Sequence, residues 1–588
     1  MQPSGAQPSG IKRSGSDGEA PGSSAAAKKF VPIVVAVLAV IGIVAAVVLS
    51  GGDDDQPKDA ATTTAVPKSG ATSLADLDWP EGVVPFPVAK AAGTEQDIDW
   101  GDRCDTERGL VALPLFSQQD CFAPFKGDNG GATSTGVTAD EIKVVVYLTQ
   151  PNDPVLKFIY QQINNDDTVD QIWETYQSFN EMFARYYETY GRKVKLVRYD
   201  ATGSILDSVA AVADAEAIAA MEPFMVLNGP NLTNAFADTL AARRVMCISC
   251  TPGQPNDWYE QRAPYVWDIQ KNPTQNQQLS AEYIGKRLAG RPAEFAGDDA
   301  LKAKERVFGY IRVVGSDSAQ ALEDAYVAEL AKYDVEFARI ETYATPTELA
   351  GTGRDIISRM KEAGVTSVVF AGDPLAPQTL TTIATDQQFF PEWVITGTVL
   401  VDTTAFSRTY DQKQWAHAFG PSNLFARVDP AVAGGAYLHN WYYGQPAPAD
   451  QTLAVLIPNL QFLYNPLPGA GPTLTPQRVQ DLLFSIPAIA STPSTPQVSY
   501  GNRGFFPGPD YAALDDQVEV WWDATATGVD ELGRQGTGMW RYVDGGKRFL
   551  PGQWPESEPV LFDPAGTVTV LDEPPAAARL PDDYVPVK

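Results

Sequence analysis

Histidine is nearly absent from this chain of 588 residues. The two histidines, His417 and His439, lie 22 residues apart, whereas a metal site usually needs three or four ligands of suitable geometry. The sequence also lacks the HExxH, GxSxG and GxxxxGK(S/T) motifs that mark zinc proteases, serine hydrolases and P-loop NTPases. We therefore predict no metal site, no cofactor and no enzymatic activity.

Basic residues are also few, with 44 Lys and Arg against 73 Asp and Glu, which gives a formal net charge of -29. Nucleic-acid binding needs clustered positive charge, so a nucleic-acid partner is excluded. An acidic surface fits a soluble body that faces a salty exterior. Hydrophobic residues make up 44% of the chain, and its length exceeds one ordinary domain of about 100–200 residues.

Long hydrophobic runs are absent except for residues 30–49, FVPIVVAVLAVIGIVAAVVL, which carry no charge. Twenty such residues are long enough to cross a bilayer as a helix. Basic residues precede the run and three aspartates follow it, which predicts a cytoplasmic N-terminus and an exported body. A cleaved signal peptide is the alternative, but its apolar part is normally about 7–15 residues, so we favour a retained single-pass anchor in the cell membrane.

Cysteine is scarce, with four in the chain, and none follows the apolar run to carry a lipoprotein anchor. An even number in an exported chain suggests disulfides. Cys104 and Cys121 flank a short loop, and we expect them to pair. Cys247 and Cys250 form a CISC sequence before a Thr-Pro-Gly turn, which favours a structural disulfide over a redox dithiol. A zinc site that uses both pairs is unfavourable because the first pair lacks CxxC spacing.

Short apolar runs alternate with amphipathic stretches from about residue 140. This pattern predicts parallel sheets with helices on both faces. The predicted strands are 142–148, 193–198, 224–227, 245–249, 306–313, 335–342, 367–370 and 392–395. The predicted helices are 171–190, 205–221, 233–242, 276–289, 319–333, 355–363 and 379–387. No glycine-rich phosphate loop follows the first strand, which disfavours a nucleotide cofactor.

Several phrases, in this order, resemble the branched-chain amino-acid-binding branch of the type I periplasmic-binding family. They are GVTADEIKV at 136–144, LNGPNLTNAFADTLAARRVMCISCTP at 227–252, YVW at 265–267, RVFGYIRVVGSDSAQALEDAY at 306–326 and GVTSVVFAGDPLAPQTLTTIATDQQFFPEWVITG at 364–397. The match covers roughly residues 134–470. The phrases CD…C, NGG and VEVWWD are similar to those of long, membrane-anchored actinobacterial members.

The resemblance implies an α/β fold of two lobes of the periplasmic-binding-protein type I class. From the apolar run and from the tail we expect, in addition, an N-terminal transmembrane helix before the lobes and a C-terminal β-rich extension after them. The expected segments are a disordered cytoplasmic tail (1–29), the transmembrane helix (30–49), a flexible stalk (50–75), an extension with a disulfide (76–135), the first part of lobe 1 (136–268), the first part of lobe 2 (269–396), crossovers and completion of both lobes (397–525) and a C-terminal extension (526–588). We also expect a strand at 515–523 and a β-hairpin over 536–554 that turns at Asp544-Gly545-Gly546.

The family binds its ligand with hydroxyls, amides and main-chain N–H groups at the carboxyl ends of strands. Carried over by position, the expected ligand-binding residues are Asn231, Thr233, Thr251, Gly253, Ser316, Asp317, Ser318, Asp373 and Thr398. Helix capping is the alternative role for those that precede helices, namely Asn231, Thr233, Asp317 and Ser318. The chain departs from the family at two points: the crossover carries Thr398 rather than an acidic residue, and Ser-Asp-Ser replaces the tyrosine after the first strand of lobe 2.

We therefore expect an extracytoplasmic protein that captures a small polar solute, an amino acid or a related compound, for an ABC permease by hinge closure of two lobes. The alternative is a ligand-sensing receptor or cell-envelope scaffold on the same fold that takes no part in transport.

Overall fold

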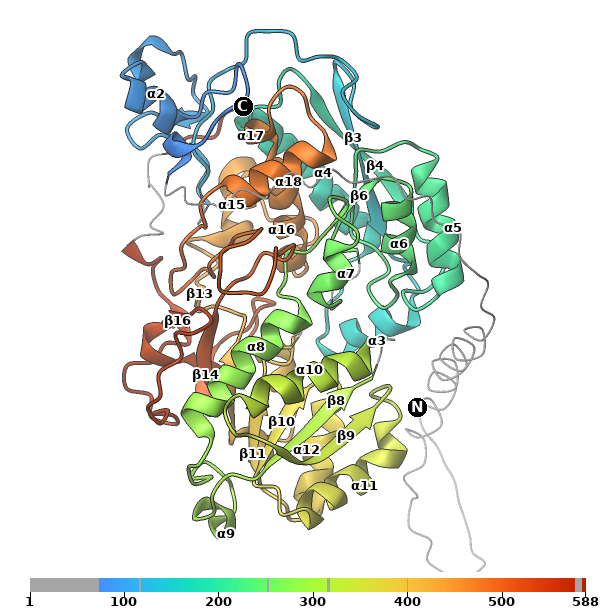
Figure 1. The fold of residues 1–588 in the computed structure, drawn as a ribbon, viewed down its shortest axis with the longest axis vertical. Helices are drawn as coiled ribbons and strands as arrows, with labels where there is room; N and C mark the ends of the chain where they lie inside the picture. Colours follow the sequence, from blue (N-terminus) through green and yellow to red (C-terminus); the bar gives the residue numbers. More distant parts are fainter. Residues whose placement is uncertain (1–72, 116–117, 251–252, 315–317, 399, 577–583) are drawn as a thin grey trace, which may run out of the picture. The chain divides into compact units, whose positions relative to one another are not determined.

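The computed structural model (Figure 1) describes residues 73–115, 118–250, 253–314, 318–398, 400–576 and 584–588. The predicted cytoplasmic tail, the apolar segment 30–49 and nearly all of the predicted stalk lie outside these residues. Within the described part, no helix combines the length and the apolar character that a membrane span requires.

The first lobe is built on a five-stranded sheet with the order β4-β3-β5-β6-β7, in which all strands are parallel. The strands are β3 (Glu141–Leu148), β4 (Lys193–Asp200), β5 (Met225–Leu227), β6 (Met246–Ile248) and β7 (Val266–Trp267). Successive valines in β3, Val144 to Val146, are fully buried. A continuous apolar run of this kind is typical of a parallel strand covered on both faces.

The helices of the first lobe come from two separate stretches of chain. They are α4 (Val169–Tyr186), α5 (Ser208–Ala219), α6 (Ala235–Ala242), α7 (Asn256–Glu260), α15 (Gly434–Tyr443), α16 (Leu453–Tyr464), α17 (Leu467–Ala470) and α18 (Pro476–Ser485). A capping box starts α4, because Thr168 and Gln171 exchange hydrogen bonds between side chain and backbone. Side chains from both stretches share one hydrophobic core with the sheet. In the sequence, the second stretch comes after residues 308–422, which carry strands of the other lobe, so the chain returns to complete the first lobe.

The second lobe has a larger sheet with the order β15-β14-β12-β11-β10-β8-β9, to which β16 adds by pairing with β14. Its strands are β8 (Phe308–Val313), β9 (Phe337–Tyr343), β10 (Ser367–Ala371), β11 (Glu392–Ile395), β12 (Ala418–Ser422), β14 (Gln517–Val529), β15 (Gln535–Tyr542) and β16 (Arg548–Phe549). The strands from β9 to β12 are parallel, and β14 runs antiparallel to β12.

Two hydrophobic clusters cover opposite faces of this sheet. Val368 and Phe370 of β10 belong to one cluster and Val369 to the other, as the two-residue period of a strand requires. Helices α11 (Leu349–Glu362) and α12 (Ala376–Asp386) cover the first face. The second face is covered by α8 (Pro273–Tyr283), its π-helical continuation Ile284–Leu288, and α10 (Ala319–Ala331). Two α/β lobes with parallel sheets flanked by helices are thus confirmed.

The predicted hairpin over 536–554 is wrong. Both β15 and β16 pair with β14, one after the other along the edge that β12 leaves free, and the tight antiparallel connection is the one between β14 and β15. The chain at Asp544-Gly545-Gly546 instead forms a short 3-10 turn, Val543–Gly545, that interrupts the pairing with β14 between β15 and β16. The prediction paired the two halves of this segment with each other, because only local signals were used. Both halves pair instead with β14, which lies earlier in the chain.

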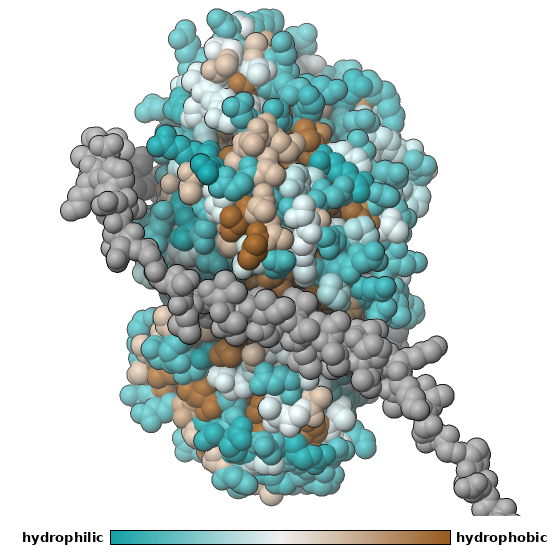
Figure 2. Space-filling model, turned by 90° about the vertical axis from the view of Figure 1, so that its right-hand side faces the viewer, coloured by the Kyte–Doolittle hydropathy of each residue, from teal (hydrophilic) through white to brown (hydrophobic). Residues whose placement is uncertain are grey.

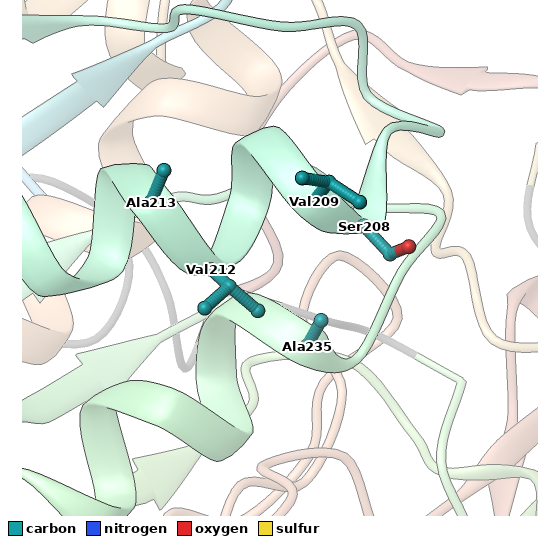
Figure 3. Close-up of a pocket in the computed structure, with 5 residues that line it drawn as sticks. All are labelled: Ser208, Val209, Val212, Ala213 and Ala235. Carbon is teal, nitrogen blue, oxygen red and sulfur yellow. The ribbon is translucent and has the colours of Figure 1, made fainter. Parts of the chain in front are cut away.

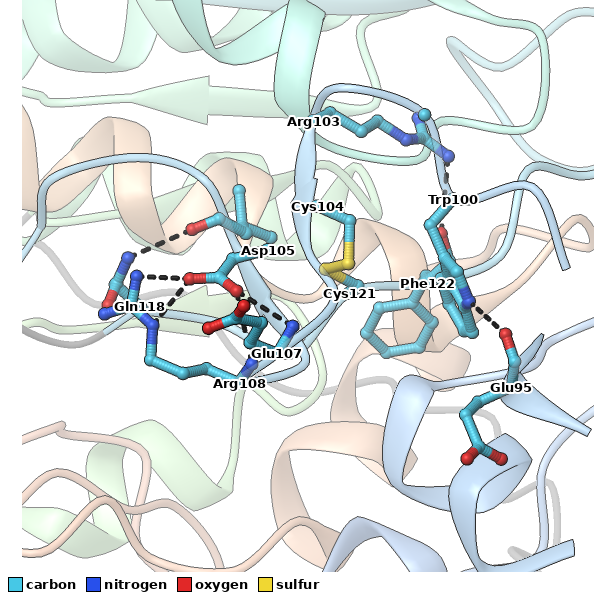
Figure 4. Close-up of a disulfide and its surroundings, with 12 residues drawn as sticks. Glu95, Trp100, Arg103, Cys104, Asp105, Glu107, Arg108, Gln118, Cys121 and Phe122 are labelled. Atoms are coloured by element: carbon cyan, nitrogen blue, oxygen red, sulfur yellow. Dashed lines mark hydrogen bonds and ion pairs between the residues drawn. A yellow bond between two sulfur atoms is a disulfide. The ribbon is translucent and has the colours of Figure 1, made fainter. Parts of the chain in front are cut away.

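A small module precedes the first lobe, and in it Cys104 and Cys121 form the expected disulfide with a Cα–Cα distance of 5.7 Å (Figure 4). The bond joins β1 (Cys104–Asp105) to the chain that returns beside β2 (Leu110–Val111) and α2 (Phe86–Ala92). Cys121 packs with Phe86, Ala89 and Trp100 in a separate hydrophobic cluster.

The smaller elements of the described chain complete the fold. They are the 3-10 turns Leu74–Asp76 and Glu95–Asp97, the helices α3 (Pro154–Gln162), α9 (Asp299–Lys302), α13 (Thr404–Ser407) and α14 (Gln412–Trp415), and the strand pair β13 (Arg427–Val428) and β17 (Val570–Leu571).

Candidate functional site at the strand ends

Polar side chains join the two loops that follow β5 and β6 in the first lobe. The Asn228 side chain lies between Tyr176 and Asn459, and it accepts a hydrogen bond from the Asn459 amide. The Ser249 hydroxyl donates to Asn459 Oδ1 at 2.9 Å. Next to Asn228, Gly229 approaches the neighbouring loop so closely that a Cβ would lie 2.6 Å from the Cys250 carbonyl oxygen. Helix α16, which carries Asn459, therefore fixes both loops.

The predicted ligand-binding residues of the first lobe follow Asn228 and Ser249 in the same two loops. Asn231 is exposed and Thr233 is partly buried, directly before α6. The Thr233 hydroxyl oxygen accepts a hydrogen bond from the Ala235 N–H at 3.3 Å, so this side chain supports the start of the helix. Gly253 is exposed in the loop after β6, and Thr251 lies outside the described residues.

Cys247 and Cys250 form a second disulfide at the end of β6, with a Cα–Cα distance of 6.0 Å. Both residues are buried in the core of the first lobe. The Cys250 sulfur lies 3.3 Å from the Asn228 carbonyl oxygen, so the bond packs against the loop after β5. Both disulfides expected from the sequence are present.

Asp373 is the best-anchored predicted residue of the second lobe. Its Oδ2 accepts a hydrogen bond from the Tyr343 hydroxyl at 2.6 Å, and its Oδ1 accepts from the N–H groups of Leu375 and Ala376. Burial raises the pKa of this carboxyl, and the same hydrogen bonds oppose the rise. Gly372 permits this arrangement, since a Cβ there would lie 2.1 Å from the Tyr343 hydroxyl. Asp373 therefore supports the turn that leads into α12, and it orients Tyr343.

Thr398 follows β11, and its side chain, unlike that of Asp373, is not held by hydrogen bonds to the described neighbours. Its hydroxyl is buried and has no hydrogen-bond partner among the residues that the structure describes. A buried hydroxyl without a partner costs free energy, so this group is one that a bound molecule or water can satisfy. Ser318 lies at the start of α10, where its carbonyl accepts from the Leu322 N–H at 2.9 Å. Ser316 and Asp317 lie outside the described residues.

Sequence reasoning missed the helix α3, which follows the carboxyl end of β3. Asp153 caps it by accepting from the N–H groups of Val155 and Leu156, and Pro154 occupies its first position. An Asp-Pro pair before an apolar stretch is a start signal that could have identified it. Ile159 and Ile163 pack against the core of the second lobe, so α3 connects the two lobes at the strand ends.

Arg534 holds the same segment from the other side. It lies between β14 and β15 of the second lobe and donates hydrogen bonds to the carbonyl oxygens of Ile163 and Asn164. It also donates to Gln451 Oε1 at 2.8 Å, just before α16. We call Arg534, Ile163, Asn164 and Gln451 the lobe latch.

Three stretches of chain connect the lobes, near residues 268–272, 422–428 and 511–517. The Lys271 ammonium donates to the Asp516 carbonyl at 2.8 Å, which joins the first stretch to the third. The Arg548 guanidinium donates to Asp516 Oδ1 at 2.9 Å and to the Leu424 carbonyl at 2.5 Å, which joins the third stretch to the second. We call Lys271, Asn276, Asn423, Asp516, Gln517 and Arg548, which these bonds and those of Asn423 to Asn276 and Gln517 connect, the hinge network.

A shallow cavity of about 540 Å³ lies between α5 and the start of α6 in the first lobe (Figure 3). It is formed by Ser208, Val209, Val212, Ala213 and Ala235. In Figure 3, Val212 points from α5 toward α6, where Ala235 lies. Figure 2 views the side that carries α5 and α6 and shows hydrophobic surface scattered among hydrophilic residues. An apolar hollow of this kind does not suit a small polar solute.

No family model matches the chain, and no curated protein matches it. Similar solved structures are solute-binding proteins of ABC transporters. A protein from R. palustris, in complex with 4-hydroxybenzoate, is 13% identical with a TM-score of 0.46 and covers 68% of this chain and 97% of its own. A leucine-, isoleucine-, valine-, threonine- and alanine-binding protein from Brucella ovis is 12% identical with a TM-score of 0.48, covering 71% and 98%.

A fatty acid ABC transporter substrate-binding protein from Thermomonospora curvata is also similar, with 12% identity and a TM-score of 0.48, covering 73% of this chain and 97% of that one. The three names state chemically different ligands. Among the described residues, no group of three or more His, Cys, Asp or Glu side chains is placed to hold a metal ion.

Proposed function

We propose that this chain is an exported solute-binding protein that captures a small polar solute between its two lobes and delivers it to an ABC importer without chemical change. The observation that carries the proposal is the architecture: two parallel-sheet lobes, three connecting stretches, and contact between the lobes at the segment that follows β3. Ligands of open α/β sheets bind at the carboxyl ends of the strands.

The ligand class follows from the groups at those ends. Asn231, Thr233, Ser318 and Thr398 offer amide and hydroxyl donors, and the buried hydroxyl of Thr398 has no described partner to satisfy it. Donors of this kind suit a carboxylate or a hydroxyl of the solute. An amino acid or a small organic acid has these groups.

The apolar segment 30–49 would tether the body to the outer face of the membrane, near the importer. A tether raises the effective concentration of a binding protein at its transporter. Closure of the lobes around the solute would then present a single shape to the permease.

A thermal-shift screen of the full chain in detergent tests the proposal, with amino acids, their amides and small organic acids as probes. A solute present at 100-fold excess over its Kd should add about 2.7 kcal/mol to the free energy of unfolding. The Thr398→Val variant should bind the same solute about 3- to 10-fold more weakly, the effect of one net hydrogen bond.

Thr382→Val is the matched control, because Thr382 is exposed and its hydroxyl donates to the Gln378 carbonyl within α12. It should bind like the wild type. If no compound class shifts the transition, the proposal of solute capture is wrong. Equal binding by wild type and Thr398→Val would remove Thr398 from the site.

A further inference from the structure

The segment between β3 and α4 leaves the first lobe, contacts the second and returns. Its first turn is fastened to the first lobe by Asp153. One oxygen of this carboxylate accepts hydrogen bonds from the N–H groups of Val155 and Leu156 at the start of α3. The other accepts from the N–H of Ile205, in the loop that follows β4, at 2.9 Å. Asp153 is only 1% exposed, so water competes little for these bonds, and the start of α3 moves with the first lobe.

The chain is tied to the first lobe again directly after α3. The hydroxyl of Thr452, the residue before α16, donates to Asp167 Oδ2 at 2.6 Å. Asn165 Nδ2 donates to the same hydroxyl oxygen at 3.4 Å, and Asn165 Oδ1 accepts from the Asp167 N–H at 2.9 Å. Both ends of the segment 153–167 are therefore held by the first lobe.

The middle of this segment contacts the second lobe instead. Ile159 and Ile163 pack against the core of that lobe. In the lobe latch, Arg534 donates to the carbonyl oxygens of Ile163 and Asn164. The side chains of Ile159, Ile163 and Arg534 are each partly exposed, whereas Asp153 is buried. The joint with the second lobe is thus the weaker one, because exposed hydrogen bonds and small apolar contacts contribute less than buried ones.

The turn that carries Arg534 is fastened to the body of the second lobe. Arg408 donates to the Gly528 carbonyl at 2.7 Å and to Asp530 Oδ2 at 3.2 Å, on the two sides of the end of β14. The Glu531 carboxylate accepts from two N–H groups at the start of α13. Arg534 therefore moves with the second lobe, while the segment that it holds moves with the first.

We propose that the segment 153–167 is a strap across the strand ends: α3 stays with the first lobe, and the lobes part only after its C-terminal end has left Arg534 and the core of the second lobe. The three connecting stretches stay covalently intact in such a movement, and the strap is the contact that breaks. The consequence for transport rests on the proposed function. Since a solute enters only the fraction of molecules in which the lobes have parted, the strap slows its entry and its release.

The distance between spin labels on the two lobes tests the strap without any solute. All four cysteines of the chain are paired, so Val209→Cys in α5 and Asp299→Cys in α9 can be labelled alone in the full chain in detergent. Val209 is 72% exposed and the Asp299 side chain 94%. The labelled protein should show one narrow distance. Arg534→Ala should raise the fraction at a second distance about tenfold or more, the effect of losing two to three net hydrogen bonds.

Two further variants keep this test decisive. Ile159→Ser weakens the joint from the side of α3 and should populate the same second distance, so the result stands if Arg534→Ala does not fold. Arg354→Ala is the matched control, because it removes an exposed arginine of α11 that pairs only loosely with Asp386, at 3.5 Å; it should keep the single distance. A wild type that already populates both distances equally, or wild-type distances in both Arg534→Ala and Ile159→Ser, overturns the proposal.

Binding kinetics distinguish the strap from solute capture itself. For a compound that the thermal-shift screen identifies, Arg534→Ala should raise the association rate by about the same factor as the fraction of parted lobes. An unchanged association rate in a variant whose lobes part would overturn the role of the strap in solute entry. If no compound of that screen binds, solute capture fails, and the label distances still decide whether the strap holds the lobes together.

Discussion

Arg306 and Glu392 form a doubly hydrogen-bonded ion pair inside the second lobe, with both side chains completely buried. Arg306 Nε lies 2.8 Å from Glu392 Oε2, and Nη2 lies 2.9 Å from Oε1. The Ser367 hydroxyl also donates to Oε2, at 2.6 Å. The pair connects Arg306, just before β8, to the first residue of β11, and neither side chain contacts solvent.

Removal of one partner should therefore destabilise the second lobe strongly. Glu392→Ala leaves the guanidinium buried without its counter-charge, and the expected loss in the free energy of unfolding is about 3–5 kcal/mol. Glu216→Ala breaks the exposed pair of Arg243 and Glu216, and it should cost far less, because solvent screens an exposed pair. Chemical denaturation with urea measures both, and similar losses in the two variants would contradict the interpretation.

Stability should also fall as the pH rises from acid to neutral, and Asp402 is one cause. Burial raises the pKa of this carboxyl from 3.8 to about 6, although the Ser422 hydroxyl donates to it at 2.5 Å. A raised pKa means that the folded state favours the neutral acid. The stabilisation is thus complete below about pH 4 and is lost as the pH rises through about 6.

Asp402→Asn removes this titration. Between pH 4 and pH 7, the wild type should lose roughly 3 kcal/mol more in free energy of unfolding than the variant, from about 1.4 kcal/mol for each unit of pKa shift. Denaturant unfolding at several pH values measures the two slopes. Parallel slopes for wild type and variant would show that Asp402 does not titrate in this range.

The regular α/β alternation could be predicted from sequence because each element carries its own local signal. The strand predicted at 367–370 is β10 (Ser367–Ala371), and the one at 392–395 is β11 (Glu392–Ile395). Each is a short apolar run between helices. A run of this length and position is typical of a parallel strand that is buried on both faces. The same local logic identified both disulfide pairs.

The hinge network and the lobe latch could not be predicted, since they depend on partners far apart in the sequence. Lys271 and Asp516 are separated by 245 positions, and Arg534 and Ile163 by 371. Neither residue type nor spacing marks such pairs in a single sequence. The candidate site was placed only through the resemblance, and the contacts of Asp373 and Thr233 with helix starts show that caps and binding loops coincide at strand ends.

The disulfide of the N-terminal module should contribute more to stability than the one in the first lobe. Cys104 and Cys121 are separated by 17 positions, whereas Cys247 and Cys250 are separated by 3. The entropy of loop closure predicts about 3 kcal/mol for the longer loop and about 2 kcal/mol for the shorter one. Double Cys→Ala variants of each pair, compared by urea denaturation, measure the difference. A larger loss for the shorter loop would mean that core packing, rather than loop entropy, dominates.

The lobe latch predicts that Arg534 controls the mobility of α3 in particular. Arg534 donates to two backbone carbonyls at the end of the α3 segment and to Gln451 of the first lobe. Arg534→Ala deletes these bonds and leaves Ile159 and Ile163 as the main contacts of the segment with the second lobe. Since a net hydrogen bond contributes about 0.5–1.5 kcal/mol, hydrogen exchange in 154–165 should accelerate by about tenfold or more. Arg339→Ala, at a partly exposed arginine of β9, should leave exchange in 154–165 unchanged. Unaltered exchange in Arg534→Ala would show that hydrophobic packing alone holds α3 between the lobes.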